Sequence, residues 1–205
     1  MPRQSICARV YNVANQMNSE LIQKISSIVE DACKAETNAF GYGTWSHHIL
    51  PMISLAQELA DRVNADKEIV TLAVLLHDYA GIKNQEFIEE HHIWGAKEAE
   101  RILKNENLEE EQIERVKRCI LAHRGSAIMD KTTEEERCVA DADAIVHIDQ
   151  LASLFYLVYA ERRMGVDEGK AWIKDKLTRD WEKMSENGRN MVKQKYDCIM
   201  ELLEE

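Results

Sequence analysis

The sequence predicts an all-α fold, and three observations lead to that prediction. The chain of 205 residues has only 2 prolines and 8 glycines, so few positions break a helix. Leu, Ala, Glu, Lys, Ile and Met are plentiful, and all of them are compatible with helices. No segment of useful length alternates apolar and polar residues between turn signals, as a half-buried strand would.

Apolar residues at helical spacing predict about seven or eight helices. The first spans residues 19–34 and has its apolar residues on one face. Ser46 can cap a second helix that extends to about Val63, and Asp66 can cap a third that ends near Asp78. The remaining helices are expected at residues 90–104, 109–123, 133–164, 167–184 and 187–203. Loops are expected at residues 40–45, 79–88 and 125–133.

The length favours one domain with a sizeable core. Residues 1–18 carry no strong pattern and are interpreted as an N-terminal extension. Residues 19–205 are expected to form a single domain, with a motif-bearing core at 44–150 and C-terminal helices at 151–205. No internal repeat or low-complexity tract divides this domain further.

The net charge of −11 argues against a dedicated nucleic-acid surface, because neutralising phosphates requires clustered Lys and Arg. The 5 cysteines are scattered, and no pair has the CxxC spacing of a thiolate zinc site. We therefore expect reduced thiols in a cytoplasmic protein. No membrane partner is expected, because no apolar segment approaches the ~20 residues that span a bilayer and the N-terminus lacks the apolar core of a signal peptide.

The histidines are concentrated at the ends of the expected helices. His47 and His48 begin the second helix, His77 ends the third, His91 and His92 begin the fourth, His123 ends the fifth, and His147 follows two aspartates in the sixth. The ends of helices in a bundle can converge on one location, and metal sites are built there from facing helices. The distribution therefore points to one shared site.

The adjacent His77 and Asp78 end an apolar helix. On a 3.6-residue period, His77 shares the apolar stripe of Val70 and Val74, and Asp78 lies about 100° further around the helix. A buried carboxylate must be paired, hydrogen-bonded or bound to a metal, and an isolated His-Asp dipeptide is most often a satisfied pair. Asp143 also lies in an apolar helix. Mixed histidine and carboxylate ligands suit Mn, Fe, Co, Ni or Zn.

Taken in order, these residues resemble the motif of the HD-domain superfamily of metal-dependent phosphohydrolases, whose fold is an all-helical bundle. The segments that carry the resemblance are Trp45-Ser46-His47-His48 with Ala56 and Ala60, Ala73-Val-Leu-Leu-His77-Asp78 (the family's AxLLHD), His91-His92-Ile-Trp-Gly95-Ala96-Lys-Glu-Ala99 (HxxxGAxxA), Cys119-Ile-Leu-Ala-His123 (IxxH) and Ala142-Asp143-Ala-Ile145. The register of the two alanines favours His48 over His47 as the first ligand.

The resemblance implies a metal site with a core of four ligands, namely His48, His77, Asp78 and Asp143. If His91 and His123 join them, Asp78 would bridge two ions; otherwise these two histidines contact substrate or have structural roles. Many relatives carry Asp-Ala-Asp-Arg-Leu-Asp at the last ligand, so Asp141 is an alternative to Asp143. One or two divalent transition-metal ions are therefore expected, drawn from Mn, Fe, Co, Ni and Zn.

The resemblance also implies a reaction, the hydrolysis of a P–O bond in a nucleotide or related small phosphate ester by a metal-activated water. Asp78 and His77 would be its catalytic residues. Arg124 and Lys83 are candidate phosphate contacts, although solvated surface charge is the ordinary alternative, and Lys83 departs from the family's usual position. Trp94 is a candidate platform for a nucleobase, with packing over the site as the alternative.

Two other functions stay open at this level. A site with six ligands resembles that of HD-type oxygenases that hold two irons, and a catalytically silent protein that binds a metal or nucleotide would show the same motif. The sequence also leaves open whether the chain forms a homodimer. Lys176, Arg179 and Lys183 recur at helical spacing, and we expect them to form the solvated basic side of an amphipathic helix rather than a substrate lid.

Overall fold

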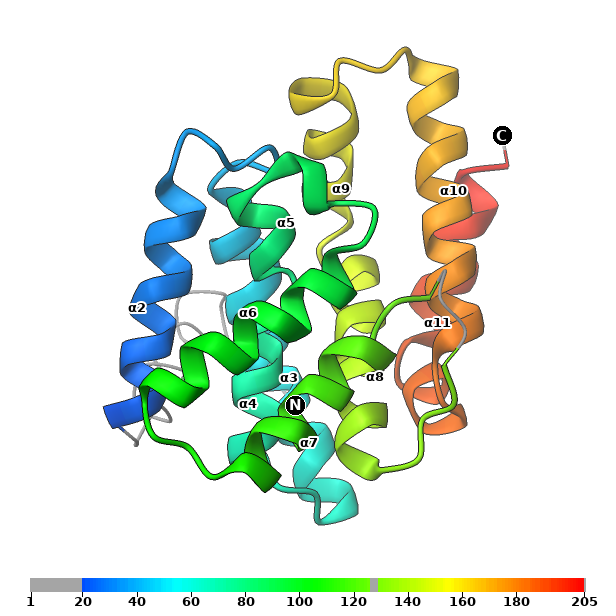
Figure 1. Cartoon of the computed structure of the whole chain (residues 1–205). Helices are drawn as coiled ribbons and strands as arrows, with labels where there is room; N and C mark the ends of the chain where they lie inside the picture. Colours follow the sequence, from blue (N-terminus) through cyan, green and yellow to red (C-terminus); the bar gives the residue numbers. More distant parts are fainter. Residues whose placement is uncertain (1–19, 126–128, 205) are drawn as a thin grey trace.

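The computed structural model describes residues 20–125 and 129–204, and these residues form helices without any strand (Figure 1). The all-α prediction is therefore confirmed, while the expected N-terminal extension, residues 1–18, lies outside the described residues. No helix in this part of the chain is both long enough and apolar enough to cross a membrane. The elements are α2 (Glu20–Lys34), η1 (Trp45–Ile49), α3 (Leu50–Val63), α4 (Lys67–Leu76), α5 (Tyr79–Lys83), η2 (Gln85–Phe87), α6 (His91–Asn105), α7 (Glu110–Ala122), α8 (Glu134–Asp149), α9 (Leu151–Tyr156), η3 (Leu157–Glu161), α10 (Val166–Lys183) and α11 (Glu186–Leu202).

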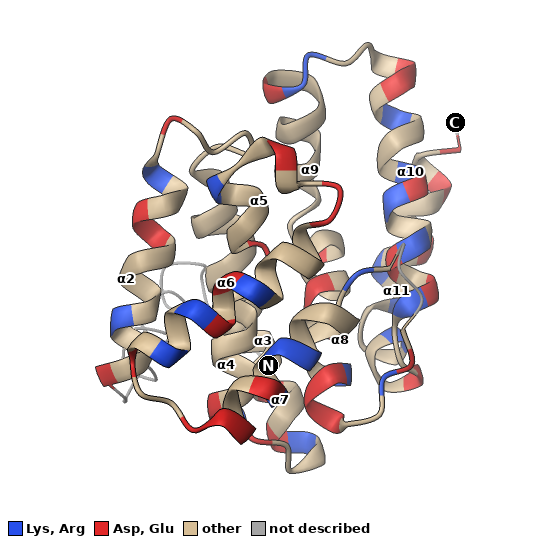
Figure 2. Ribbon diagram, in the orientation of Figure 1, with Lys and Arg blue, Asp and Glu red and all other residues tan. Residues whose placement is uncertain are grey.

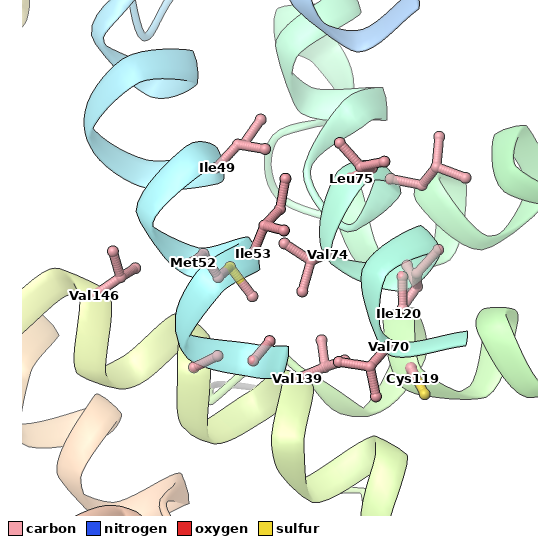
Figure 3. Packing of buried hydrophobic residues seen from close by; sticks show 14 of the residues in the cluster. Ile49, Met52, Ile53, Val70, Val74, Leu75, Cys119, Ile120, Val139 and Val146 are labelled. Carbon is pink, nitrogen blue, oxygen red and sulfur yellow. The ribbon is translucent and has the colours of Figure 1, made fainter. Parts of the chain in front are cut away.

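Helix α4 forms the centre of the core. Every residue from Ile69 to Leu76 is buried, and the helix contacts α2, α3, α7 and α8. Figure 3 shows Ile53 of α3, Val74 of α4, Ile120 of α7 and Val139 of α8 in this packed interior. Complete burial of one such side chain stabilises the fold by ~1.5–3 kcal/mol. The end of α4, where His77 and Asp78 follow, is therefore firmly supported.

Local hydrogen bonds decide where two helices begin. The Asp66 side chain accepts backbone hydrogen bonds at the start of α4, as predicted. The predicted cap at Ser46 is wrong, because η1 begins at Trp45 and the Ser46 hydroxyl hydrogen-bonds with the ring of His47. Backbone hydrogen bonds from Thr44 and Trp45 to the preceding loop start this helix earlier than the cap pattern indicated.

The predicted continuous helix over residues 133–164 is wrong. Helix α8 ends at Asp149, and Gln150 has a non-helical backbone with φ −109° and ψ 38°. The chain then forms α9 and the π-helical segment η3, from which Leu154 and Val158 are buried in the core. No Pro or Gly marks the break, so tertiary packing overrides a local preference for helix. The expected loop at 79–88 is also partly helical, because α5 occupies its first half.

A glycine lets the beginning of α6 lie against the end of α4. A Cβ atom on Gly95 would lie 3.1 Å from the His77 carbonyl oxygen and 3.3 Å from a side-chain carbon of Ile120. These distances leave little room for any larger residue. The close approach brings His91, at the start of α6, to the same place as His77.

Candidate metal centre

The ends of several helices bring the six predicted ligands together. They are His48 in η1, His77 and Asp78 after α4, His91 at the start of α6, His123 after α7 and Asp143 within α8. His77 is completely buried. The others line one cavity of about 480 Å³. The neighbouring His47 is exposed and does not line this cavity, so the structure places His48 rather than His47 at the site.

Three of these histidines are held by the same backbone interaction. The Nδ1 atoms of His77, His91 and His123 lie 2.7, 2.7 and 2.6 Å from the carbonyl oxygen three residues earlier. A carbonyl oxygen can only accept a hydrogen bond, so each Nδ1 carries a proton. In the neutral ring, Nε2 then presents a lone pair, which is the form that binds a metal.

These Nε2 atoms face one another in pairs. His91 Nε2 lies 3.1 Å from His123 Nε2, and His48 Nε2 lies 3.1 Å from His77 Nε2. Two lone pairs at this distance repel each other unless a proton or a cation lies close to both. The donor chemistry of the site therefore fits a cation.

The Asp78 carboxylate lies between the two histidine pairs. Its Oδ2 is 3.2 Å from His77 Nε2 and 3.6 Å from His48 Nε2. Its Oδ1 is 3.4 Å from His91 Nε2 and 3.9 Å from His123 Nε2. Asp78 therefore belongs to two groups that could hold a metal ion, one with His48 and His77 and the other with His91 and His123.

The structure brings Asp143, and not Asp141, to the histidines. Asp143 Oδ1 lies 3.3 Å from His48 Nε2, and its Oδ2 forms an ion pair with Lys183. The Asp141 carboxylate instead accepts hydrogen bonds from the backbone N–H and the hydroxyl of Ser185. Asp141 thus ties the start of α11 to α8, and its burial raises the pKa of that carboxyl group.

Burial and neighbouring charges shift the pKa values of the histidines in different directions. Burial lowers the pKa of His48 to about 3 and moves the pKa of His123 well below its usual range. Burial also disfavours the charged form of His77, but the adjacent Asp78 carboxylate more than offsets it and raises the pKa of His77 to about 9. Without a metal, His48 and His123 are therefore neutral near pH 7, as ligands must be.

The carboxylates stay ionised despite their burial. Burial alone would raise the pKa of Asp78, but the nearby histidines, His77 first among them, lower it well below its ordinary value. Burial acts on Asp143 in the same sense, and the Lys183 ammonium group reverses the effect and lowers the pKa of Asp143. Both carboxylates are therefore available as negatively charged ligands at neutral pH.

These shifts predict that the metal-free protein loses stability when the pH falls from 7 to 5. The pKa of His48 is lower in the folded state (about 3) than in the unfolded state (6.5), so its contribution is complete above pH 6.5 and is lost as the pH falls. At pH 5 this loss is on the order of 2 kcal/mol. His77 acts in the opposite sense, but only between pH 6.5 and about 9. Thermal melts of metal-free protein at pH 7 and pH 5 measure this loss of stability. His48→Gln should weaken the pH dependence of the melting temperature. Equal melting temperatures of the wild type at pH 7 and pH 5 would contradict the prediction.

Apolar and positively charged side chains line the rest of the cavity. The apolar lining includes Phe40, Ile88, Leu154, Leu157 and Trp172. The positively charged lining consists of Arg124, Arg162, Lys176, Arg179 and Lys183. The candidate phosphate contact Arg124 is therefore at the cavity, where its guanidinium group also donates to the Glu89 carbonyl oxygen.

Two other substrate contacts expected from the sequence lie away from this cavity. Lys83 hydrogen-bonds with Glu98 at 3.4 Å and lines a separate hollow. Trp94 stacks on Phe87 with ring centroids 4.6 Å apart, and the Lys97 ammonium group lies 4.0 Å from the centroid of its ring. The structure does not bring Lys83 or Trp94 to the six residues of the site.

Sequence reasoning missed a buried group of charges beside Asp143. Figure 2 shows that α10 carries both positive and negative residues. The Lys183 and Asp180 side chains are only 5% and 2% exposed, so the expected solvated basic side is wrong for Lys183. Lys183 pairs with Asp143, and Lys176 pairs with Asp180, which also lies 3.1 Å from His147 Nδ1. The sequence did contain one signal of this group. Asp180 has Lys176 four residues before it and Lys183 three residues after it, so all three share one face of a helix.

Comparisons with known proteins found a family profile and solved structures that match this chain. The family profile of the HD domain matches residues 45–146. YpgQ of Bacillus subtilis, solved in complex with ADP, is 21% identical and superimposes with a TM-score of 0.64 over 89% of this chain and 94% of its own. The Lin1889 protein of Listeria innocua is 20% identical, with a TM-score of 0.63 over 90% of this chain and 92% of its own.

A third solved structure is a predicted HD superfamily hydrolase from an uncultured Thermotogales bacterium. It is 21% identical, with a TM-score of 0.58 over 89% of this chain and 88% of its own. No curated protein sequence matches the chain. At these identities the solved structures establish the shared fold, and the profile match covers the segment that supplies all six residues of the site. The chain therefore belongs to the HD-domain family.

Proposed function

We propose that the protein hydrolyses a P–O bond of a nucleotide or a related small phosphate ester with a metal-activated water. The observation that carries the proposal is the Asp78 carboxylate, which lies between two pairs of histidines whose Nε2 atoms face each other. Two pairs of imidazoles sharing one carboxylate have the nitrogen and oxygen donors that divalent transition metals prefer.

Six side chains would hold the metal. His48, His77, Asp78 and Asp143 would hold one ion, and Asp78, His91 and His123 would hold a second. A bound divalent ion lowers the pKa of water toward neutrality and neutralises charge on a phosphoryl oxygen. The backbone carbonyls that accept from Nδ1 of His77, His91 and His123 would orient these rings and select their tautomer.

The lining of the cavity supports a phosphorylated substrate. Arg124, Arg162 and Arg179 line the same cavity as Asp78, and Arg179 has no ion-pair partner among the described residues. Guanidinium groups bind phosphate oxygens in a bidentate manner. The apolar side of the cavity suits a base or another flat apolar group. Since one neighbour of the same fold was solved with ADP, a nucleotide is the first class to test.

The proposal is tested by metal analysis followed by a screen for phosphate release. Purified protein is stripped of metal, reloaded separately with Mn, Fe, Co, Ni, Zn or Mg, and incubated with nucleoside mono-, di- and triphosphates, cyclic nucleotides and simple phosphate monoesters. We expect release of phosphate or pyrophosphate that depends on a transition metal and stops when the metal is chelated. Metal-loaded protein that turns over none of these esters would contradict the proposal.

A second candidate is a di-iron oxygenase, favoured by the full set of six side chains, Asp78 among them, that the structure brings together. Such an enzyme needs iron and O₂, whereas the proposed hydrolase works under argon. Oxygen consumption by the iron-loaded protein, with no phosphate release under any metal, would favour the oxygenase.

A further inference from the structure

The two lysines that line the cavity are neutralised by buried carboxylates. Lys183 pairs with Asp143 and Asp180, and its side chain is 5% exposed. Lys176 donates to both oxygens of Asp180 at 2.8 Å. Buried charges are normally paired in this way. Two ammonium groups and two carboxylates therefore balance each other, and neither lysine is left free to bind an anionic substrate.

The three arginines of the cavity have no buried carboxylate as a partner among the described residues. Arg124 donates to the Glu89 carbonyl oxygen and lies 3.6 Å from the Glu89 carboxylate, which is 91% exposed. The Arg162 guanidinium group lies 4.6 Å from the centroid of the Trp172 ring. Arg179 forms no hydrogen bond, ion pair or ring contact in this part of the chain. The wall of the cavity therefore carries free positive charge, although the net charge of the chain is −11.

One face of α10 runs along the cavity from its aromatic end to the proposed metal centre. Trp172, Lys176, Arg179 and Lys183 recur at spacings of 4, 3 and 4 residues, and all four line the cavity. Residues three or four apart share one face of a helix. The stretch from Trp172 to Lys183 covers about 16 Å along the helix axis. Because Lys183 contacts Asp143, Arg179 lies one turn further from the proposed metal centre.

The residues that follow α7 lie against this part of α10. A Cβ atom on Gly125 would lie 3.2 Å from the Arg179 carbonyl oxygen and 3.2 Å from Cδ of Lys183. Arg124 directly precedes Gly125 and directly follows His123, one of the proposed ligands. Arg124 and Arg179 therefore belong to two segments in contact, and both line the cavity close to the proposed metal centre.

We propose that Arg179, with Arg124 beside it, binds a second phosphate group, so that the site prefers a ligand with a chain of two or more phosphates to a monophosphate. This inference rests on the proposed hydrolysis, in which the first phosphate lies at the metal centre. A second phosphate joined to the first lies further along the cavity, where Arg179 is the cation without a partner. A guanidinium group holds two phosphate oxygens at once, so Arg179 suits this position better than a lysine would.

The test measures the binding of two pairs of probes by calorimetry, with metal-free and with Mn-loaded protein. One pair is adenosine 5′-monophosphate and the non-hydrolysable α,β-methylene analogue of adenosine 5′-diphosphate. The other pair, inorganic phosphate and methylenediphosphonate, lacks the nucleoside. In at least one pair we expect the wild type to bind the probe with two phosphorus atoms about tenfold more tightly or better.

Arg179→Gln should weaken the binding of that probe by about 10- to 100-fold, and the binding of its partner with one phosphorus atom by less than about threefold. Arg179→Lys keeps the charge without the planar fork and should recover part of the affinity. Because Arg179 is exposed and has no partner among the described residues, both variants should keep the helical content of the wild type.

Arg62→Gln is the matched control, because Arg62 is exposed, pairs with Glu58 and does not line the cavity. It should keep wild-type affinities for all four probes. No preference of the wild type in either pair, or equal losses of Arg179→Gln on both members of a pair, would overturn the inference and return Arg179 to the solvated side of α10. If Arg179-dependent binding is found but no ester releases phosphate, the proposed hydrolysis fails, while the assignment of Arg179 to a second phosphate is supported.

Discussion

Asp78→Ala is expected to abolish metal-dependent phosphate release while leaving a folded helical chain. Asp78 is the residue shared by two candidate groups of metal ligands, one with His48 and His77 and the other with His91 and His123. Its loss would remove the carboxylate that lies between the two histidine pairs and, in the proposed centre, binds the metal. Since a metal contributes several kcal/mol to stabilising the transition state, the rate should fall by at least about 10³-fold. Metal content per chain should fall in parallel.

The comparison for this variant is Asp61→Ala, which removes an exposed aspartate that pairs with Lys67. Circular dichroism should show the same helical content for both variants and for the wild type. Phosphate release should be unchanged in Asp61→Ala. Undiminished activity of Asp78→Ala at equal metal content would refute the proposed centre.

Lys183→Met is expected to destabilise the protein strongly. Lys183 is 5% exposed and pairs with two buried carboxylates, those of Asp143 and Asp180. Burial alone would lower the pKa of Lys183, but the two carboxylates raise it, so the side chain is charged. Removing one partner of a buried ion pair leaves uncompensated charge and costs about 3–5 kcal/mol. The melting temperature should fall by roughly 10 °C for a chain of this size.

Two further variants test whether the effect of Lys183→Met comes from the loss of a buried positive charge. Lys183→Arg keeps the positive charge and should recover much of the stability. Lys193→Met removes an exposed lysine that pairs with Asp197 and should change the free energy of unfolding by less than about 1 kcal/mol. If Lys183→Met melts at the temperature of Lys193→Met, the buried charges do not depend on Lys183.

Much of the proposed centre could be predicted from the sequence because its signals are local. The apolar stripe before His77 and Asp78 predicts the buried end of α4, and every residue from Ile69 to Leu76 is indeed buried. The family's motif order predicts that distant histidines share one site, and the 3.1 Å separation of His91 Nε2 and His123 Nε2 agrees with it. That these residues bind metal stays a prediction until metal analysis is done.

Other residues could not be assigned from a single sequence. Asp141 and Asp143 both lie in an apolar segment, two residues apart. Their roles differ because they contact different partners, Ser185 for Asp141 and Lys183 for Asp143. Lys83 and Arg124 likewise each follow a predicted helix end, yet only Arg124 lines the cavity. Neither difference appears in helical spacing.

The sequence by itself determined that the fold is helical, the resemblance to the family and the order of the histidines and carboxylates, since periodicity and motif spacing are properties of neighbouring residues. Only the tertiary structure decided what surrounds Asp143. Helix α10 lies against α8, and it places Lys183 on Asp143 and Asp180 on His147 across 40 and 33 residues of chain, respectively. Hydrophobic packing decides such contacts between distant segments, and it is non-directional, so no local pattern records them.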